Sequence, residues 1–129
     1  WGIIPGIAVG AGYGLLDFML KPYFVHPVQV LLDYPIAFGA LGIAGIAYSM
    51  AKGKQNLPFT ILGIGVSIAI FGRLVAHVLS GVVFFAVYAG DQNPWIYSLV
   101  YNATYLVPEL IISVIVLMII WRPVKKILR

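Results

Sequence analysis

Residues 57–88 read LPFTILGIGVSIAIFGRLVAHVLSGVVFFAVY, and Arg73 is the only charged side chain among them. A helix that crosses a bilayer needs ~20 predominantly apolar residues at a rise of ~1.5 Å each, so this stretch is long enough to span, tilt or bend. Three more apolar stretches occupy residues 2–20, 28–51 and 95–121. A transmembrane β-barrel would show shorter segments of alternating polarity instead. The sequence therefore predicts an all-α integral membrane protein, with four transmembrane helices in one domain covering residues 1–129.

The composition of the whole chain indicates the same class. Of its 129 residues, 62% are hydrophobic and 9% are charged, whereas a soluble domain carries roughly 25% charged residues. The absence of cysteine excludes a secreted disulfide scaffold, and the high hydrophobicity excludes intrinsic disorder. The net charge of +4 does not indicate a nucleic-acid partner, because the charges form no basic face.

Positive charge is divided unevenly between the two sides of the predicted bundle. With four spans, the 52–56 connection and the 122–129 tail share one side, whereas the other side carries Lys21 and Asp91. The basic residues of the shared side are Lys52, Lys54, Arg122, Lys125, Lys126 and Arg129. The positive-inside rule therefore predicts a cytoplasmic tail, with the other two connections facing outward.

Small residues recur at helical spacing in the first two apolar stretches. Gly6, Gly10 and Gly14 form a tandem G-x-x-x-G pattern, and a second set of glycines includes Gly42 and Gly45. Such patterns let helices approach closely in membranes. Packing within this chain and docking of another membrane subunit are the two interpretations.

Two charged residues are predicted to meet deep in the bilayer. Counted inward from the outer ends of their helices, Arg73 lies ~22 Å and Glu109 ~21 Å from the surface. A charged side chain inside a membrane needs a partner, so the depths predict an Arg73–Glu109 ion pair that locks two helices together. The alternative is that Arg73 extends toward the cytoplasmic interface.

A second polar layer lies closer to the outer surface, within ~16 Å of the helix ends. It contains Asp33, His77, Tyr97 and Asn102, and many aromatic residues surround it. Rings can stack on a flat heterocycle while Asn and Asp bind its polar edge, and a positive charge would suit both the rings and the acid. The sequence thus predicts an outward-open pocket for a small, planar, polar ligand. Alternatively, the aromatic residues form an interfacial belt and the histidine is structural.

Catalytic and metal-binding patterns give little support to an enzyme. The chain has no H-E-x-x-H, G-x-S-x-G or phosphate-loop motif and no cysteine. Asp33 and His77 are a candidate acid–base pair, but no nucleophile or metal set accompanies them. We therefore expect no catalytic residues, no metal site and no cofactor.

Two stretches carry a family resemblance. GRLVAHVLSGVVFFAVYAGDQNPWIYSLVYNATYLVPE (72–109) contains the pattern H-x-x-S-G-x-x-F-[FW]-x-x-Y-A followed by Y-S-x-x-x-N, and KPYFVHPVQVLLDYPIAFGALGIAG (21–45) supports it. Across most of its length, the chain resembles the thiamin-specific S components of energy-coupling factor (ECF) transporters, the ThiT/YuaJ family.

The resemblance implies an architecture, a function and partners. It implies a six-helix bundle in a prokaryotic plasma membrane, of which this chain carries the last four helices. It also implies an S subunit of an ECF-type ABC transporter that captures thiamin from outside. Such a subunit would work with a transmembrane coupling subunit and with two ATPase subunits that bind and hydrolyse ATP, so this chain would not be an enzyme.

The resemblance also implies a set of ligand contacts. The family's thiamin-binding positions correspond here to Tyr23, Asp33, Tyr34, His77, Phe85, Tyr97 and Asn102. Phe85 and His77 are expected near the aminopyrimidine ring, with Asn102 and Tyr97 at its edge. Asp33 is expected to pair with the cationic or amino part, and Tyr23 and Tyr34 to line the thiazolium end. The acid is often Glu in the family, and a family Trp aligns with Phe85.

Three other functions remain open at this point. The chain could be an S component for another small heterocyclic vitamin, or a structural or assembly protein without a ligand. It could also be an intramembrane enzyme that uses Asp33 and His77. Ligand binding, vitamin competition and product formation distinguish these functions.

Overall fold

Helices form the whole architecture of the described chain. The computed structural model describes residues 2–51 and 58–127, and within these ranges it contains no strand. Four helical stretches are long and apolar enough to cross a membrane: Ile3–Leu20, Pro27–Met50, Phe59–Phe84 and Pro94–Trp121. The predicted class, an all-α membrane protein, is confirmed. The 52–56 connection with Lys52 and Lys54, and Arg129 of the tail, lie outside the described residues.

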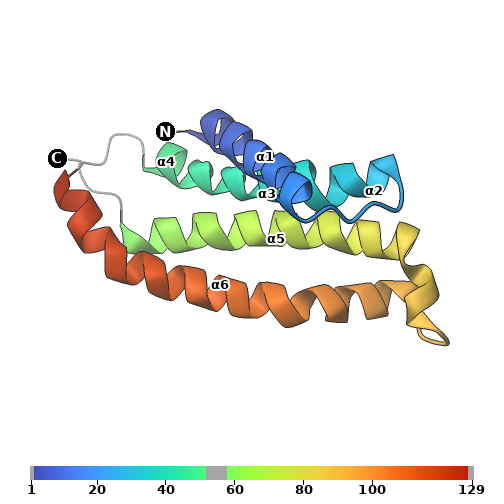
Figure 1. The fold of residues 1–129 in the computed structure, drawn as a ribbon. Helices are drawn as coiled ribbons and strands as arrows, with labels where there is room; N and C mark the ends of the chain where they lie inside the picture. Colours follow the sequence, from blue (N-terminus) through green and yellow to red (C-terminus); the bar gives the residue numbers. More distant parts are fainter. Residues whose placement is uncertain (1, 52–57, 128–129) are drawn as a thin grey trace.

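The spans pack side by side in chain order (Figure 1). The first span is α1 (Ile3–Leu20), and it packs on the second span, Pro27–Met50. The opposite side of the second span packs against α5 (Phe59–Phe84), which in turn packs along α6 (Pro94–Ile127). The connections 21–26 and 90–93 lie at one end of the bundle, opposite the two chain ends (Figure 1).

The second span changes helix type several times. It consists, in order, of α2 (Pro27–Leu31), the π-helical η1 (Leu32–Ile36), α3 (Ala37–Ala40), the 3₁₀-helical η2 (Leu41–Gly45) and α4 (Ile46–Met50). Pro35 lies inside η1. Proline lacks the backbone N–H that a regular α-helix needs and its ring crowds the preceding turn, so the helix widens there. Pro35 therefore lies in a π turn and does not end the span.

Main-chain atoms form the contact between α1 and the second span. A Cβ added at Gly6 would lie 2.8 Å from the Gly42 carbonyl oxygen, and one added at Gly10 would overlap the Phe38 carbonyl oxygen. A Cβ at Gly42 would overlap the backbone of Gly6 and Ile7. These glycines therefore pack within the chain, which is the first of the two interpretations that their spacing allowed.

The boundaries of the last two spans differ from the prediction. Residues 57–88 were expected as one segment, but α5 ends at Phe84 and a 3₁₀ turn, η3 (Ala86–Ala89), follows. Gly90 then adopts φ +56°, a conformation that favours glycine. Helix α6 includes Pro108 without a break and continues past residue 121 to Ile127, into the basic segment expected as a tail.

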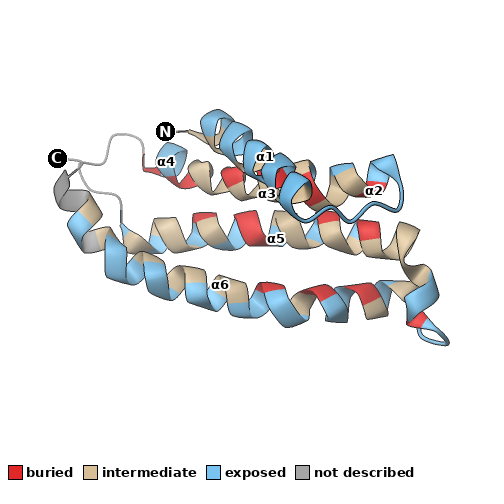
Figure 2. Cartoon of the chain, viewed as in Figure 1, coloured by how far each residue is buried: buried red, intermediate tan, exposed pale blue. Residues whose placement is uncertain are grey.

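Several of the buried side chains in the bundle are polar. Figure 2 shows that the buried residues of α6 lie along its edge facing α5. The buried polar side chains are those of Gln29, Ser80, Ser98 and Asn102. Most large apolar side chains of α1 and α6 are exposed, as expected when lipid replaces water around a helix bundle. The polar side chains that avoid lipid gather near one end of the bundle and outline the candidate site.

Candidate functional site

A pocket of about 460 Å³ lies between the second span, α5 and α6, near the 21–26 connection. Its volume is within the usual range for small-molecule sites. Its lining consists of Tyr23, Asp33, His77, Gly81, Phe85, Tyr88, Tyr97, Ser98, Tyr101, Asn102 and Tyr105. The only charged side chain of this lining is Asp33, so the pocket presents one carboxylate within largely aromatic walls.

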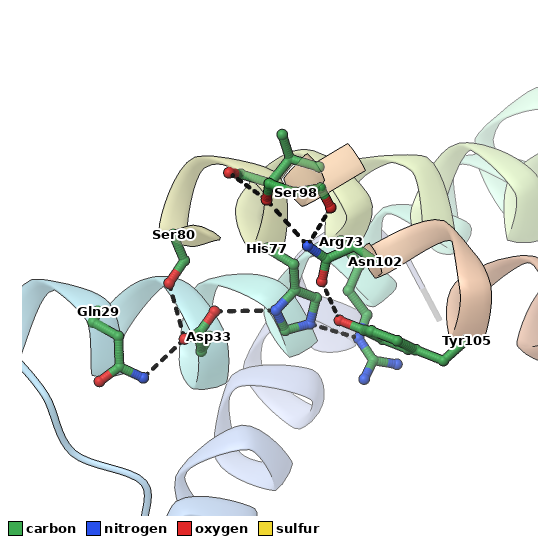
Figure 3. Close-up of polar contacts among 9 residues, drawn as sticks. Gln29, Asp33, Arg73, His77, Ser80, Ser98, Asn102 and Tyr105 are labelled. Atoms are coloured by element: carbon green, nitrogen blue, oxygen red, sulfur yellow. Dashed lines mark hydrogen bonds and ion pairs between the residues drawn. The ribbon is translucent and has the colours of Figure 1, made fainter. Parts of the chain in front are cut away.

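Asp33 lies in the π turn η1 and accepts three hydrogen bonds (Figure 3). Its Oδ2 accepts from Gln29 Nε2 at 2.8 Å and from Ser80 Oγ at 2.9 Å. Its Oδ1 lies 3.1 Å from His77 Nδ1. The side chain of Asp33 is 19% exposed and faces the pocket, so these bonds fix the carboxylate without covering it.

His77 lies between Asp33 and a cation on α5 (Figure 3). Arg73 Nε is 3.3 Å from His77 Nε2. An arginine N–H can only donate, so Nε2 must accept and the imidazole proton must be on Nδ1, where it points to Asp33. This geometry requires a neutral His77. Both ring nitrogens are engaged, which leaves the ring face for the pocket and no free nitrogen to transfer a proton.

Arg73 is held on three sides. Its Nη1 forms an ion pair with Glu109 Oε1 at 2.5 Å, as expected from their matched depths. Its guanidinium carbon lies 4.4 Å from the centre of the Phe38 ring, within cation–π range. The charge of Arg73 is therefore balanced by Glu109, while Asp33 receives hydrogen bonds from neutral groups.

Asn102 belongs to a separate hydrogen-bonded group on α6. Its Nδ2 donates to the Ser98 carbonyl oxygen at 2.8 Å and lies 3.3 Å from Ser98 Oγ, and its Oδ1 accepts from the Tyr105 hydroxyl. Ser98 Oγ donates to the Val78 carbonyl oxygen of α5 at 3.1 Å. A Cβ at Gly81 would overlap Ser98 Oγ, so Gly81 allows α6 to approach α5 at the pocket floor.

Aromatic rings line two sides of the pocket. Phe85 stacks on Tyr23 with 5.9 Å between ring centres, and it also contacts Tyr88 at 6.3 Å. On α6, Tyr101 stacks on Tyr97 at 6.2 Å. The neighbouring Tyr88 phenol, followed by burial, raises the pKa of Tyr23. These surfaces can stack on a flat ring and attract a cation.

Two buried side chains hold the 21–26 connection beside the pocket. The Tyr34 hydroxyl donates to the Lys21 carbonyl oxygen at 3.1 Å and accepts from Tyr23 N at 3.2 Å. Gln29 Oε1 accepts from Val25 N at 3.1 Å. The position of Tyr23 over the pocket therefore depends on side chains of the second span.

Comparison with known proteins identifies a family. A family model described as thiamine transporter protein (Thia_YuaJ) matches residues 1–129. This chain belongs to the thiamine transporter family. The thiamine transporter ThiT of Bacillus subtilis is 42% identical over 137 residues, which cover 100% of this chain and 71% of that protein. ThiT of Lacticaseibacillus paracasei is 31% identical over 111 residues, covering 78% and 55% of the two chains. No solved structure matches this chain.

In this member of the thiamine transporter family, all but one of the predicted ligand contacts line the same pocket. Six of them line the pocket: Tyr23, Asp33, His77, Phe85, Tyr97 and Asn102. Tyr34 does not line it, since the Tyr34 side chain is buried and its hydroxyl is bonded to the 21–26 connection. The two predicted polar layers are joined, because Arg73 contacts both Glu109 and His77.

The predicted ligand set omitted five lining residues: Gly81, Tyr88, Ser98, Tyr101 and Tyr105. Helical spacing was the available signal for α6, because Ser98, Asn102 and Tyr105 lie on one stripe. The sequence gave no signal for Gly81, because its place in the pocket depends on how closely α6 approaches α5. Within the described part of the chain, no cluster of three or more His, Cys, Asp or Glu residues suits a metal ion.

Proposed function

We propose that this chain is the substrate-binding part of an S subunit of an ECF-type ABC transporter, and that the pocket binds thiamin for uptake. The charge of Asp33 is the observation that supports it best. Its three hydrogen-bond donors are neutral, whereas the other intramembrane acid in the network, Glu109, is paired with Arg73. A cationic ligand would complete this arrangement, and thiamin carries a quaternary thiazolium.

The proposed binding mode uses rings for the flat faces and polar groups for the edges. Phe85 and the face of His77 would stack near the aminopyrimidine, and Asp33 would receive its amino group or the adjacent positive charge. Tyr97 and Asn102 would bind the ring edge. Asn102 already bonds Ser98 and Tyr105, so we expect ligand binding to share or exchange one of these bonds. Tyr23 would close over the thiazolium end.

The proposed role is binding, with the energy supplied by partners. Two ATPase subunits would hydrolyse ATP, a transmembrane coupling subunit would join them to this chain, and no chemistry would occur in this chain. The engaged nitrogens of His77 support binding over acid–base catalysis. We also propose a prokaryotic plasma membrane location, with the pocket facing outward and the basic C-terminal segment in the cytoplasm, in line with the positive-inside rule.

The test is a thiamin titration of the purified protein in detergent, measured by calorimetry, with riboflavin and biotin as competitors. We expect saturable thiamin binding that neither competitor displaces. Asp33→Asn should raise the Kd roughly tenfold to a hundredfold, because a hydrogen bond to a charged group contributes ~1.5–3 kcal/mol. Asp91→Asn removes an exposed acid from the 90–93 connection and is the matched control. Absence of thiamin binding by folded wild-type protein would reject the proposal.

A further inference from the structure

Gln29 is a buried amide that bonds two different parts of the site. Gln29 is 1% exposed, and it does not line the pocket. Oε1 accepts a hydrogen bond from Val25 N at 3.1 Å, and Nε2 donates to Asp33 Oδ2 at 2.8 Å. One side chain therefore joins the 21–26 connection, which carries Tyr23, to the pocket carboxylate.

The chemistry of the two partners fixes the orientation of the amide. A backbone N–H can only donate, so Val25 requires the oxygen end of Gln29, and the carboxylate of Asp33 requires the nitrogen end. Glutamate would keep the first bond and lose the donor for the second. Lysine would lose the acceptor, and methionine, of similar length, would lose both. Glutamine is thus the residue of this length that satisfies both partners at once.

We propose that Gln29 is a positioning residue that couples the 21–26 connection to Asp33, so that the orientation of the acid and the position of Tyr23 change together. The proposal rests on the pocket being the thiamin site. Gln29 acts through Asp33 and has no contact with the ligand. A ligand that holds Asp33 would then also hold the connection over the pocket, and loss of the acid would release it.

Two other residues each bond only one of the two parts that Gln29 joins. They allow the effect of holding the connection to be measured apart from the effect of holding the acid. Tyr34 bonds the connection through Lys21 and Tyr23 but has no hydrogen bond to Asp33. Ser80 bonds Asp33 Oδ2 but has no hydrogen bond to the connection. Tyr34→Phe therefore removes hydrogen bonds to the connection only, and Ser80→Ala removes a hydrogen bond to the acid only. Gln29→Met removes both bonds.

The first test is hydrogen–deuterium exchange of the amides in residues 21–26, measured on the ligand-free protein in detergent. We expect Gln29→Met and Asp33→Ala each to accelerate exchange at Val25 about tenfold, although Asp33 has no hydrogen bond to this connection. Gln92→Met makes the same side-chain change at an exposed position and should leave the rate unchanged. A wild-type rate at Val25 in folded Asp33→Ala would overturn the proposal, and this measurement does not require Gln29→Met to fold.

The second test is a double-mutant cycle on thiamin affinity. Gln29→Met should raise the Kd about tenfold in the wild-type background and less than twofold in the Asp33→Ala background, because its effect passes through the acid. Tyr34→Phe, which keeps both hydrogen bonds of Gln29, should still raise the Kd in the Asp33→Ala background. Equal effects of Gln29→Met in both backgrounds would overturn the coupling. If the wild-type protein binds no thiamin, the proposed function fails, and the exchange experiment still decides the role of Gln29.

Discussion

His26 and His77 accept hydrogen bonds on opposite ring nitrogens. Val28 N donates to His26 Nδ1 at 3.1 Å, which caps the start of α2. Arg73 Nε donates to His77 Nε2. A neutral imidazole carries one proton, so His26 must be protonated on Nε2 and His77 on Nδ1. The tautomer of His77 is what directs its N–H to Asp33 and presents its ring to the pocket.

We expect the nitrogen NMR spectrum of the ¹⁵N-histidine-labelled protein at pH 8 to show one histidine of each tautomer. Arg73→Met removes the donor to His77 Nε2 and should shift the His77 signals toward a mixture, because the other tautomer then costs less. The His26 signals should not move, which makes this residue the internal control. Identical tautomers for the two histidines in the wild-type spectrum would contradict the assignment.

Among the elements, α1 and the second span make their contact largely through glycines. It brings main chain against main chain at Gly6, Gly10 and Gly42. Gly12 lies on the same helix but faces open space, since a Cβ there meets nothing within 4 Å. Gly6, Gly10 and Gly42 thus have a steric reason to be glycine. Gly12 has no such reason within the described bundle.

We expect Gly10→Ala to lower the melting temperature of the protein in detergent, because the added methyl overlaps the Phe38 carbonyl and forces the helices apart. Overpacking of this kind costs about 1–3 kcal/mol. Gly12→Ala makes the same chemical change on the open face and should leave the melting temperature unchanged or slightly raise it. Equal melting temperatures for the two variants would show that the close contact does not contribute to stability.

The sequence predicted four spans, and six of its seven expected ligand contacts line the pocket, but it did not predict the local geometry of the second span. Apolar length identifies a membrane helix whatever its internal hydrogen bonding, so the π turn around Pro35 was not predicted. Polar residues inside spans pointed to Asp33 and His77. Tyr34 could not be placed correctly, because its hydroxyl bonds the backbone of a connection whose path depends on tertiary packing.

At the scale of the whole molecule, the pocket and the chain ends lie at opposite ends of the bundle (Figure 1). Tyr23 and Tyr88 mark the pocket end, which the 90–93 connection shares. Residues 122–127, the described part of the basic segment, continue α6 at the other end. The molecule therefore has a pocket end and an end that carries the basic segment, and its orientation in the membrane decides to which side the pocket opens.

Cysteine labelling in cells tests that orientation, and the sequence contains no native cysteine that would interfere. We expect Gln92→Cys, in the exposed 90–93 connection, to react with a membrane-impermeant maleimide added to intact cells. Lys54→Cys, in the connection predicted to be cytoplasmic, should react only after the cells are permeabilised. The reverse pattern would place the pocket on the cytoplasmic side and would contradict uptake from outside.

The π turn at Leu32–Ile36 also affects how this chain can vary in length. A π turn takes up about one residue more than an α-helical turn while the segments on either side keep nearly the same faces, so removing one residue there would restore α-helical winding and leave Gly39 and Gly42 facing α1. One residue removed from α3 instead has no such surplus to draw on and would rotate everything after it by ~100°, which turns Gly42 away from α1. A single-codon deletion within Leu32–Ile36 should thus disturb the packing of the second span less than one within Ala37–Ala40. The wide turn gives this span a place where its length can change by one residue without changing its neighbours.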